Sequence, residues 1–155
     1  MKNKIKKYLK EIVIFIITIT FFTNAISLYR SMDLTKSPLP QSLHVEQNKP
    51  IMIHFWATWC PVCKAEADNI QRLSEDYQVI TIAVKSGSDE DIQTYLAKQD
   101  LNFKVINDTD GELAKKFGVN IYPTTFIYDK NREMVFSDVG YTSTWGLKLR
   151  MWYAN

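Results

Sequence analysis

The 155-residue sequence is poor in the residues that build covalent or metal-stapled scaffolds, with two cysteines and two histidines. Two cysteines cannot form a disulfide framework, but they can form one redox pair or half of a metal site. An excess of one charge sign is also missing, because 19 Lys+Arg stand against 17 Asp+Glu. Five of these cations are lysines within the first eleven residues, so no basic face is left for nucleic acid. With 46% apolar residues, the length and composition predict one globular domain.

The N-terminal segment has its own pattern, in which the lysine cluster precedes eighteen uncharged residues from Ile12 to Tyr29. As a helix this stretch would be about 27 Å long, close to the roughly 30 Å of a bilayer core. We expect residues 1–30 to form a cytoplasmic basic tip and a single-pass inner-membrane anchor, residues 31–49 a tether, and residues 50–155 a domain in the periplasm or extracytoplasmic space. The alternative is a cleaved signal peptide, with Ala25-Ile26-Ser27 as the cleavage site.

Alternating strand and helix patterns follow the tether. The apolar run 51–56 predicts a strand, and a helix follows with Cys60 as its N-cap and Pro61 as its first residue. Its expected inner face comprises Val62, Glu66, Ile70, Leu73 and Tyr77. The continuous run 79–84 predicts a parallel strand buried on both faces, and Ser88 with Asp91 predicts a capping box for a helix that buries Ile92, Tyr95 and Leu96. This order indicates an α/β fold.

The second half of the sequence is expected to complete the same sheet. We predict a strand over 103–106, a short helix ending at Phe117 and Gly118, and a hairpin formed by 124–128 and 134–136. The turn at 108–111 lacks the EF-hand spacing, so its residues are expected to serve the backbone rather than calcium. A last helix begins after Thr142 or Ser143, and Leu43 with Val45 forms an edge strand. The stripe Trp145, Leu149 and Trp152 is expected to pack on the sheet.

The chemistry of the sequence is concentrated in Trp59-Cys60-Pro61-Val62-Cys63. A helix N-terminus stabilises an anion, so Cys60 is the expected nucleophilic thiolate, and Cys63 is placed one turn further to resolve a mixed disulfide. A permanent disulfide across so short a loop would add little stability, and zinc would need two more ligands. Copper binding by the two cysteines and Met52 stays open as an alternative, as does a redox-inert scaffold.

Three segments together resemble a known family: 55–63 with its WCxxC motif, 119–126 with Tyr122-Pro123, and 140–147. They are similar to thioredoxin-fold proteins, and more narrowly to the membrane-tethered TlpA/DsbE/ScsD-like disulfide oxidoreductases of the bacterial envelope. The resemblance covers about residues 51–152. It implies a central mixed sheet flanked by helices and a cis Pro123 facing the cysteines. Trp59 and Tyr122 are implied to contact the substrate, and no cofactor or metal is expected.

The sequence departs from cytosolic thioredoxins at His54, where those proteins have a buried aspartate. The resemblance suggests Glu66 as the substitute acid, and its place on the inner stripe one turn after Cys63 agrees. We therefore expect Glu66→Gln to slow release of the mixed disulfide more than its formation. A Glu66 that reaches water at the helix edge is the alternative. His54 is expected to be held by a local hydrogen bond.

The resulting functional prediction is an envelope thiol-disulfide oxidoreductase. Pro61 and Val62 bring no cation or side-chain donor to Cys60, so its thiolate is only moderately stabilised and the dithiol is expected to be a net reductant. The family implies recharging by a DsbD-like membrane reductase and partners that are thiol-bearing or disulfide-bearing envelope proteins. A disulfide oxidase is the alternative direction.

Overall fold

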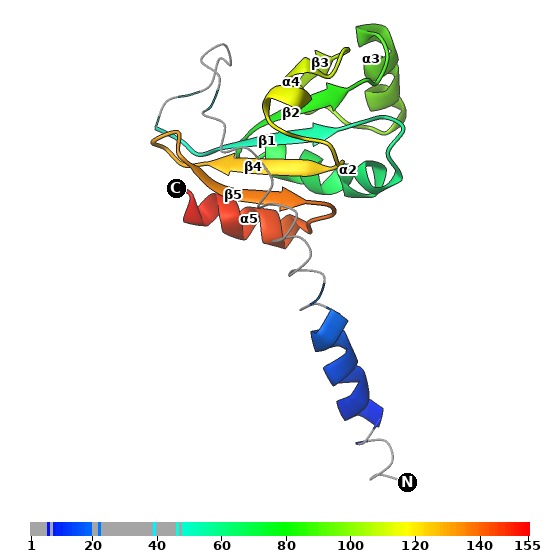
Figure 1. The fold of residues 1–155 in the computed structure, drawn as a ribbon, viewed down its shortest axis with the longest axis vertical. Coiled ribbons are helices and arrows are strands. Elements are labelled where there is room, and N and C mark those ends of the chain that lie inside the picture. Colours follow the sequence, from blue (N-terminus) through cyan, green and yellow to red (C-terminus); the bar gives the residue numbers. More distant parts are fainter. Residues whose placement is uncertain (1–5, 7, 20–21, 23–38, 40–45, 47) are drawn as a thin grey trace.

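The computed structural model describes residues 6, 8–19, 22, 39, 46 and 48–155. Residues 51–154 form an α/β unit in which helices cover a five-stranded sheet (Figure 1). The strand order is β3-β2-β1-β4-β5, with β1, β2 and β3 parallel and β4 and β5 antiparallel to their neighbours. The predicted thioredoxin-like α/β architecture with a mixed sheet is therefore confirmed.

The elements follow the order expected from the sequence. The strands are β1 (Ile51–Trp56), β2 (Gln78–Val84), β3 (Val105–Asp108), β4 (Thr124–Tyr128) and β5 (Met134–Val139). The helices are α2 (Pro61–Ser74), α3 (Asp89–Lys98), α4 (Glu112–Lys116) and α5 (Thr144–Tyr153).

Two apolar clusters lie on opposite faces of the sheet, because successive side chains of a strand point to opposite sides. One cluster joins Met52 and Trp56 of β1 to the buried residues of α2, α3 and α5, and it includes both cysteines. The other joins Phe55 of β1 to Phe126 of β4 and Phe117, which follows α4, with ring centroids 5.1 to 5.9 Å apart. The central strand β1 is thus buried on both faces.

The register of β1 decides which residues face the cysteine-bearing helix. In the antiparallel pair β1–β4, His54 lies opposite Thr125, and in the parallel pair β1–β2 it lies opposite Thr81. His54 shares its face of β1 with Met52 and Trp56, whose side chains belong to the same cluster as Cys60 and Cys63. A polar side chain therefore reaches the underside of the cysteine pair from the centre of the sheet.

The predicted helix starts are confirmed. Cys60 is the N-cap of α2 with Pro61 at the first position, Ser88 and Asp91 form a reciprocal capping box on α3, and Ser143 caps α5. The acidic turn also has the expected backbone role, because the carboxylate of Asp108 accepts hydrogen bonds from the backbone N–H groups of Leu113 and Ala114 at 3.1 and 2.9 Å. These contacts fix the start of the short helix α4.

Three details of the sequence prediction are wrong. Strand β3 begins two residues later than predicted, at Val105, because Phe103 is part of the loop and packs into the apolar cluster. Val62 is 43% exposed, and Cys63 takes the inward position at that turn of α2. The stripe Trp145, Leu149 and Trp152 faces outward rather than toward the sheet, with exposures of 83%, 64% and 69%. In α5 the buried residues are Leu147 and Met151, which lie on the opposite side of the helix.

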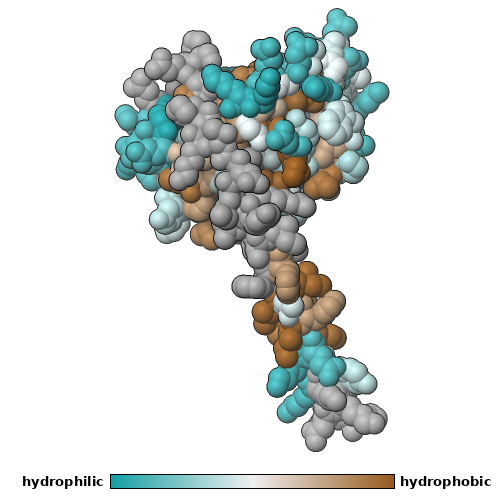
Figure 2. Space-filling model, viewed as in Figure 1, coloured by the Kyte–Doolittle hydropathy of each residue, from teal (hydrophilic) through white to brown (hydrophobic). Residues whose placement is uncertain are grey.

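Residues 8–19 of the N-terminal segment are helical, and Figure 2 shows apolar side chains along this helical segment. The run from Ile12 to Ile17 is exposed at every position, from 51% to 65%. Among the residues that the structure describes, no helix is long and apolar enough to cross a membrane. The predicted edge strand at Leu43 and Val45, and most of the predicted tether, lie outside the described residues.

Candidate active site

The two cysteines form a disulfide at the start of α2, with their Cα atoms 5.3 Å apart. Cys60 caps the helix, and its Sγ accepts a hydrogen bond from the backbone N–H of Cys63 at 3.1 Å. Both side chains are buried, at 5% and 3% exposure. The free N–H groups of the first helical turn therefore point at Cys60, which is the arrangement that stabilises a thiolate once the disulfide is reduced.

The loop before β4 covers the disulfide from the other half of the chain. The peptide bond between Tyr122 and Pro123 is cis, as the resemblance implied. The carbonyl oxygen of Tyr122 lies 3.7 Å from Sγ of Cys60, and Pro123 is buried. The carbonyl of Pro123 accepts a hydrogen bond from Gly140 at 2.8 Å, which joins this loop to the end of β5.

Aromatic side chains form the exposed rim of the site. Trp59 is 60% exposed, and its indole N–H donates to the backbone carbonyl of Lys85 at 3.0 Å. Its ring meets the half-buried ring of Tyr122 edge to face, with centroids 5.7 Å apart. Val62 and Ile121 are also exposed, at 43% and 45%. The structure thus brings the two predicted substrate-contacting residues together beside the disulfide.

Glu66 lies beneath the disulfide, one turn after Cys63, and its side chain is fully buried. Its Oε1 accepts a hydrogen bond from the backbone N–H of Thr142 at 2.7 Å, whereas its buried Oε2 has no hydrogen-bond partner among the described residues. The alternative in which Glu66 reaches water at the edge of the helix is therefore wrong. Burying a carboxyl group with only one of its oxygens hydrogen-bonded lowers the stability of the fold, which argues against a purely structural role for Glu66.

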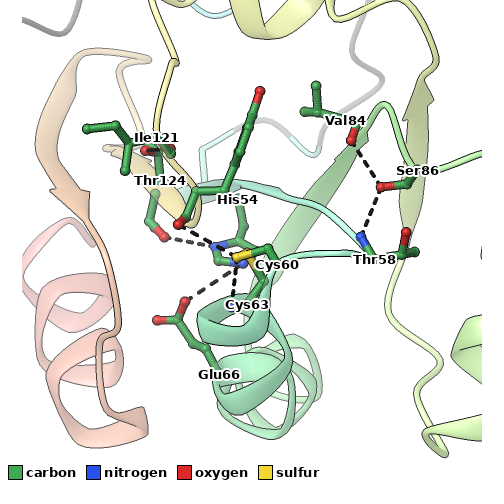
Figure 3. Close-up of a disulfide and its surroundings, with 11 residues drawn as sticks. His54, Thr58, Cys60, Cys63, Glu66, Val84, Ser86, Ile121 and Thr124 are labelled. Atoms are coloured by element: carbon green, nitrogen blue, oxygen red, sulfur yellow. Dashed lines mark hydrogen bonds and ion pairs between the residues drawn. A yellow bond between two sulfur atoms is a disulfide. The ribbon is translucent and has the colours of Figure 1, made fainter.

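His54 occupies the same buried region from strand β1. Its Nδ1 lies 2.9 Å from Oγ1 of Thr125, so the expected hydrogen bond is present, although its partner is 71 positions away in the sequence. Its Nε2 lies 3.9 Å from Oε2 of Glu66, and Figure 3 shows the imidazole ring and the carboxyl group directed toward each other. His54, which stands where cytosolic thioredoxins have an aspartate, thus lies next to Glu66, the acid suggested to take over the role of that aspartate.

Burial decides the protonation of this pair. It raises the pKa of Glu66 to about 8, and the hydrogen bond from Thr142 opposes this only in part, while the charge of Asp138 adds to it. Burial also lowers the pKa of His54 to about 3. Near pH 7 the pair is therefore a neutral imidazole beside a protonated carboxyl group, not an ion pair.

The described residues contain no group of three or more His, Cys, Asp and Glu side chains that could hold a metal ion. Met52, which the copper alternative would use, is fully buried in β1 within the same apolar cluster as the cysteines.

Sequence reasoning missed the residues that hold Glu66 and His54. Thr142 reaches Glu66 across 76 positions of sequence, and Thr125 reaches His54 across 71. Neither contact has a local sequence signal, because each depends on the packing of the loop after β5 or on the β1–β4 register. Strand pairing alone could have suggested Thr125, since the two residues are direct partners.

Comparison with known proteins agrees with this geometry. The model of the AhpC/TSA family matches residues 35–137, and the chain belongs to this family. The described residues form a thioredoxin-like fold that carries a CxxC disulfide, and these two features define the class of the protein.

Individual relatives are named as thioredoxin-like or thiol-disulfide oxidoreductase proteins. The chain is 40% identical over 111 residues to a thioredoxin-like protein of Haemophilus influenzae, covering 71% of this chain and 66% of the relative. It is 34% identical over 92 residues to the thiol-disulfide oxidoreductase ResA of Oceanobacillus iheyensis, covering 57% of this chain and 48% of the relative. The chain thus spans between about half and two thirds of the length of these relatives.

A solved structure gives the same picture. A secreted disulfide oxidoreductase of Mycobacterium tuberculosis, described as homologous to Escherichia coli DsbE, superimposes with a TM-score of 0.61 at 27% identity. The match covers 69% of this chain and 83% of that one.

Proposed function

We propose that the protein is a thiol-disulfide oxidoreductase of the bacterial envelope. The observation that carries this proposal is the Cys60–Cys63 disulfide at the N-terminus of α2, with Sγ of Cys60 3.7 Å from the Tyr122 carbonyl. The relatives named ResA and DsbE-like support it. No separate cofactor is required, because the two sulfurs carry both electrons of the reaction.

In the proposed reaction, the Cys60 thiolate attacks a disulfide of the client protein and forms a mixed disulfide. Cys63 then attacks Sγ of Cys60 and releases the client as a thiol. The helix N-terminus favours Cys60 as the first nucleophile. The position of Glu66 one turn below Cys63 favours the ionised form of its carboxyl group as acceptor of the Cys63 proton.

The client surface is proposed to be the rim formed by Trp59 and Tyr122. These rings offer an exposed apolar contact next to the disulfide. Pro123 is proposed to position the adjoining backbone, so that the Tyr122 segment pairs with an extended stretch of the client.

We propose that electrons flow from this protein to its clients. Pro61 and Val62 supply no positive charge or side-chain donor to Cys60, so the thiolate is stabilised mainly by the helix terminus. A DsbD-like membrane reductase would then recharge the dithiol. A negative charge on Glu66 would oppose formation of the nearby Cys60 thiolate, but only above the pKa of the carboxyl group, because burial keeps that group protonated near pH 7.

Residues 1–30 are proposed to anchor the chain in the inner membrane, with residues 31–49 as the tether and 50–155 as the periplasmic domain. The support is the order of five lysines followed by eighteen uncharged residues, a pattern that retains the positive end in the cytoplasm.

The decisive experiment is equilibration of the protein with glutathione redox buffers of graded potential. A two-electron transition that requires both cysteines is expected, on the reducing side of the glutathione couple. A Cys60→Ser chain is the matched control and should show none. A transition on the oxidising side, with fast oxidation of unfolded thiol substrates, would identify an oxidase instead. Absence of exchange would overturn the proposed function. Trapping with Cys63→Ala in the native envelope would identify the clients.

A further inference from the structure

His54 and Glu66 form a buried polar pair under the disulfide. Their side chains are 2% and 0% exposed, and the shortest approach is 3.9 Å between Nε2 and Oε2. Oε1 of the same carboxyl group already accepts a hydrogen bond from Thr142, so within the described part of the chain Oε2 is the oxygen without a hydrogen bond. A buried carboxylate oxygen needs a donor when it is ionised, and the imidazole edge is directed at it (Figure 3).

Thr125 fixes the imidazole ring from the opposite side. Its hydroxyl lies 2.9 Å from Nδ1, and the two residues are direct partners in the β1–β4 pairing. If the hydroxyl donates to Nδ1, the ring proton of neutral His54 resides on Nε2, which faces Glu66. In that tautomer, the sheet register holds an N–H donor next to Oε2 of Glu66.

The other groups around Glu66 do not provide that donor. The backbone of Thr142 donates to Oε1, and Asp138 of β5 brings a negative charge that raises the pKa of Glu66. Asp138 is itself paired with Arg150 of α5, at 2.9 Å from Nε and 3.1 Å from Nη2. Cys63 lies one turn away on α2 as the group whose proton is to be moved. Among the described residues, no hydrogen bond reaches Oε2.

We propose that His54 is a positioning residue for Glu66, whose Nε2–H hydrogen-bonds to Oε2 when the carboxyl group is ionised and so keeps it a usable base for Cys63. This inference rests on the proposed function and adds to it a residue that cytosolic thioredoxins lack. The neutral imidazole donates its hydrogen bond without giving up its proton. Ionisation of the carboxyl group draws the two atoms together from 3.9 Å.

In the mixed disulfide, the Cys63 thiol transfers its proton to the Glu66 carboxylate and becomes a thiolate. That thiolate attacks Sγ of Cys60, the bond between Cys60 and the client sulfur breaks, and the client leaves as a thiolate that takes a proton from water. The cysteine pair is oxidised by two electrons and the client sulfurs are reduced by two, while His54 retains its proton throughout.

Two substitutions separate this role from a structural one. His54→Gln places an amide N–H near the position of Nε2, whereas His54→Asn keeps a polar group only near the position of Nδ1. The reduced proteins are mixed with Ellman's reagent in a stopped-flow instrument across a pH range. The first release of thionitrobenzoate reports attack by Cys60, and the second reports resolution by Cys63.

His54→Asn is expected to shift the pH midpoint of the second release upward by roughly one pH unit, because a hydrogen bond to an ionised carboxylate is lost. His54→Gln should restore a midpoint near that of the unsubstituted protein. The first release should be unchanged in both. Thr81→Val is the matched control, since Thr81 is also buried and paired with His54, yet it binds the indole of Trp56 at 3.0 Å rather than Glu66.

Equal midpoints in the Asn and Gln chains would overturn the inference, as would a downward shift in the Asn chain. If the Asn chain does not fold, His54→Leu carries the same prediction. A second measurement is the carbon-13 NMR titration of the Glu66 carboxyl group, whose pKa should be higher in the Asn or Leu chain than in the Gln chain. Release of only one equivalent of thionitrobenzoate by the unsubstituted protein would instead overturn the proposed function, and the NMR comparison would still decide the role of His54.

Discussion

The backbone N–H of Thr142 donates a 2.7 Å hydrogen bond to Oε1 of Glu66, although the two residues are 76 positions apart. The contact holds the carboxyl group of α2 against the loop between β5 and α5. Asn69, one turn further along α2, strengthens the same junction by donating to the carbonyl of Thr142 at 3.0 Å and accepting from the hydroxyl of Thr144 at 2.8 Å. The position of the acid thus depends on the C-terminal part of the chain.

The reactivity of the two cysteines in the reduced protein is the first prediction. Cys60 should react with iodoacetamide at pH 7 at least about tenfold faster than Cys63, since a pKa lowered by one unit gives about that increase in thiolate. Their exposures of 5% and 3% are too similar to produce such a difference. The single-cysteine chains Cys60→Ser and Cys63→Ser allow each rate to be read by mass spectrometry. Equal rates would falsify the assignment of the attacking thiol.

The stability of the oxidised protein should depend on the ionisation of Glu66. The folded pKa of about 8 lies above the ordinary value of 4.5, so the folded chain holds a proton that the unfolded chain releases. The stability contributed by the protonated group is present below about pH 4.5 and is lost as the pH rises to 8. The unfolding equilibrium constant should rise by up to tenfold per pH unit within this window.

Glu66→Gln tests this linkage, because glutamine does not titrate. Urea unfolding at pH 5, 6, 7 and 8 should show the Gln chain gaining stability relative to the unsubstituted protein at each step. His54 has its pKa lowered by burial and contributes a pH dependence of the opposite sign below its ordinary value of 6.5. Both chains share that contribution, so their difference isolates Glu66. A difference that is constant with pH would contradict the raised pKa.

Adjacent residues of α5 should differ sharply in their effect on stability. Met151 is fully buried, so Met151→Ala should lower the free energy of unfolding by about 2–5 kcal/mol. Trp152 is 69% exposed, and Trp152→Ala should change it by no more than about 0.5 kcal/mol. Thermal unfolding followed by circular dichroism measures both. A large loss from the Trp152 chain would mean that the outer face of α5 is covered in the folded protein.

The N-terminal segment is predicted to remain on the mature protein and to hold it in the membrane. Mass spectrometry of the envelope fraction should find a protein that retains residues 1–30 and stays with the membrane through a salt wash. A chain lacking residues 1–30 is the control and should be released. A mature protein that starts at Leu28 and is released from the membrane by the salt wash would instead establish a cleaved signal peptide.

The sequence was sufficient for the features that depend on local chemistry. The cap at Cys60, the capping box of Ser88 and Asp91, and the alternation of strands and helices follow from residue type and spacing. The resemblance supplied the cis bond before Pro123. These features depend on neighbours within a few residues, or on motifs read directly from the sequence.

The features that depend on tertiary packing were not recovered. The apolar stripe of α5 was expected in the core, yet the helix presents Leu147 and Met151 to the sheet and leaves Trp145, Leu149 and Trp152 outside. Both faces of this helix carry apolar residues, so periodicity alone does not select between them. The hydrogen-bond partners of Glu66 and His54 were not predicted for a related reason, since loop packing and strand register determine them.

The pairing of β1 with β4 also bears on which misassembled forms would be inactive. A slip of one residue would leave the CxxC sequence and the helix cap intact, because both lie after the end of β1. It would nevertheless place Ile53 or Phe55 opposite Thr125, and His54 would lose its partner or turn to the other face of the sheet. A chain with this error could still form its disulfide while lacking the contact between His54 and Glu66. A thiol assay, which reports only whether the cysteines are oxidised, would therefore not distinguish this misaligned form from the correctly folded protein.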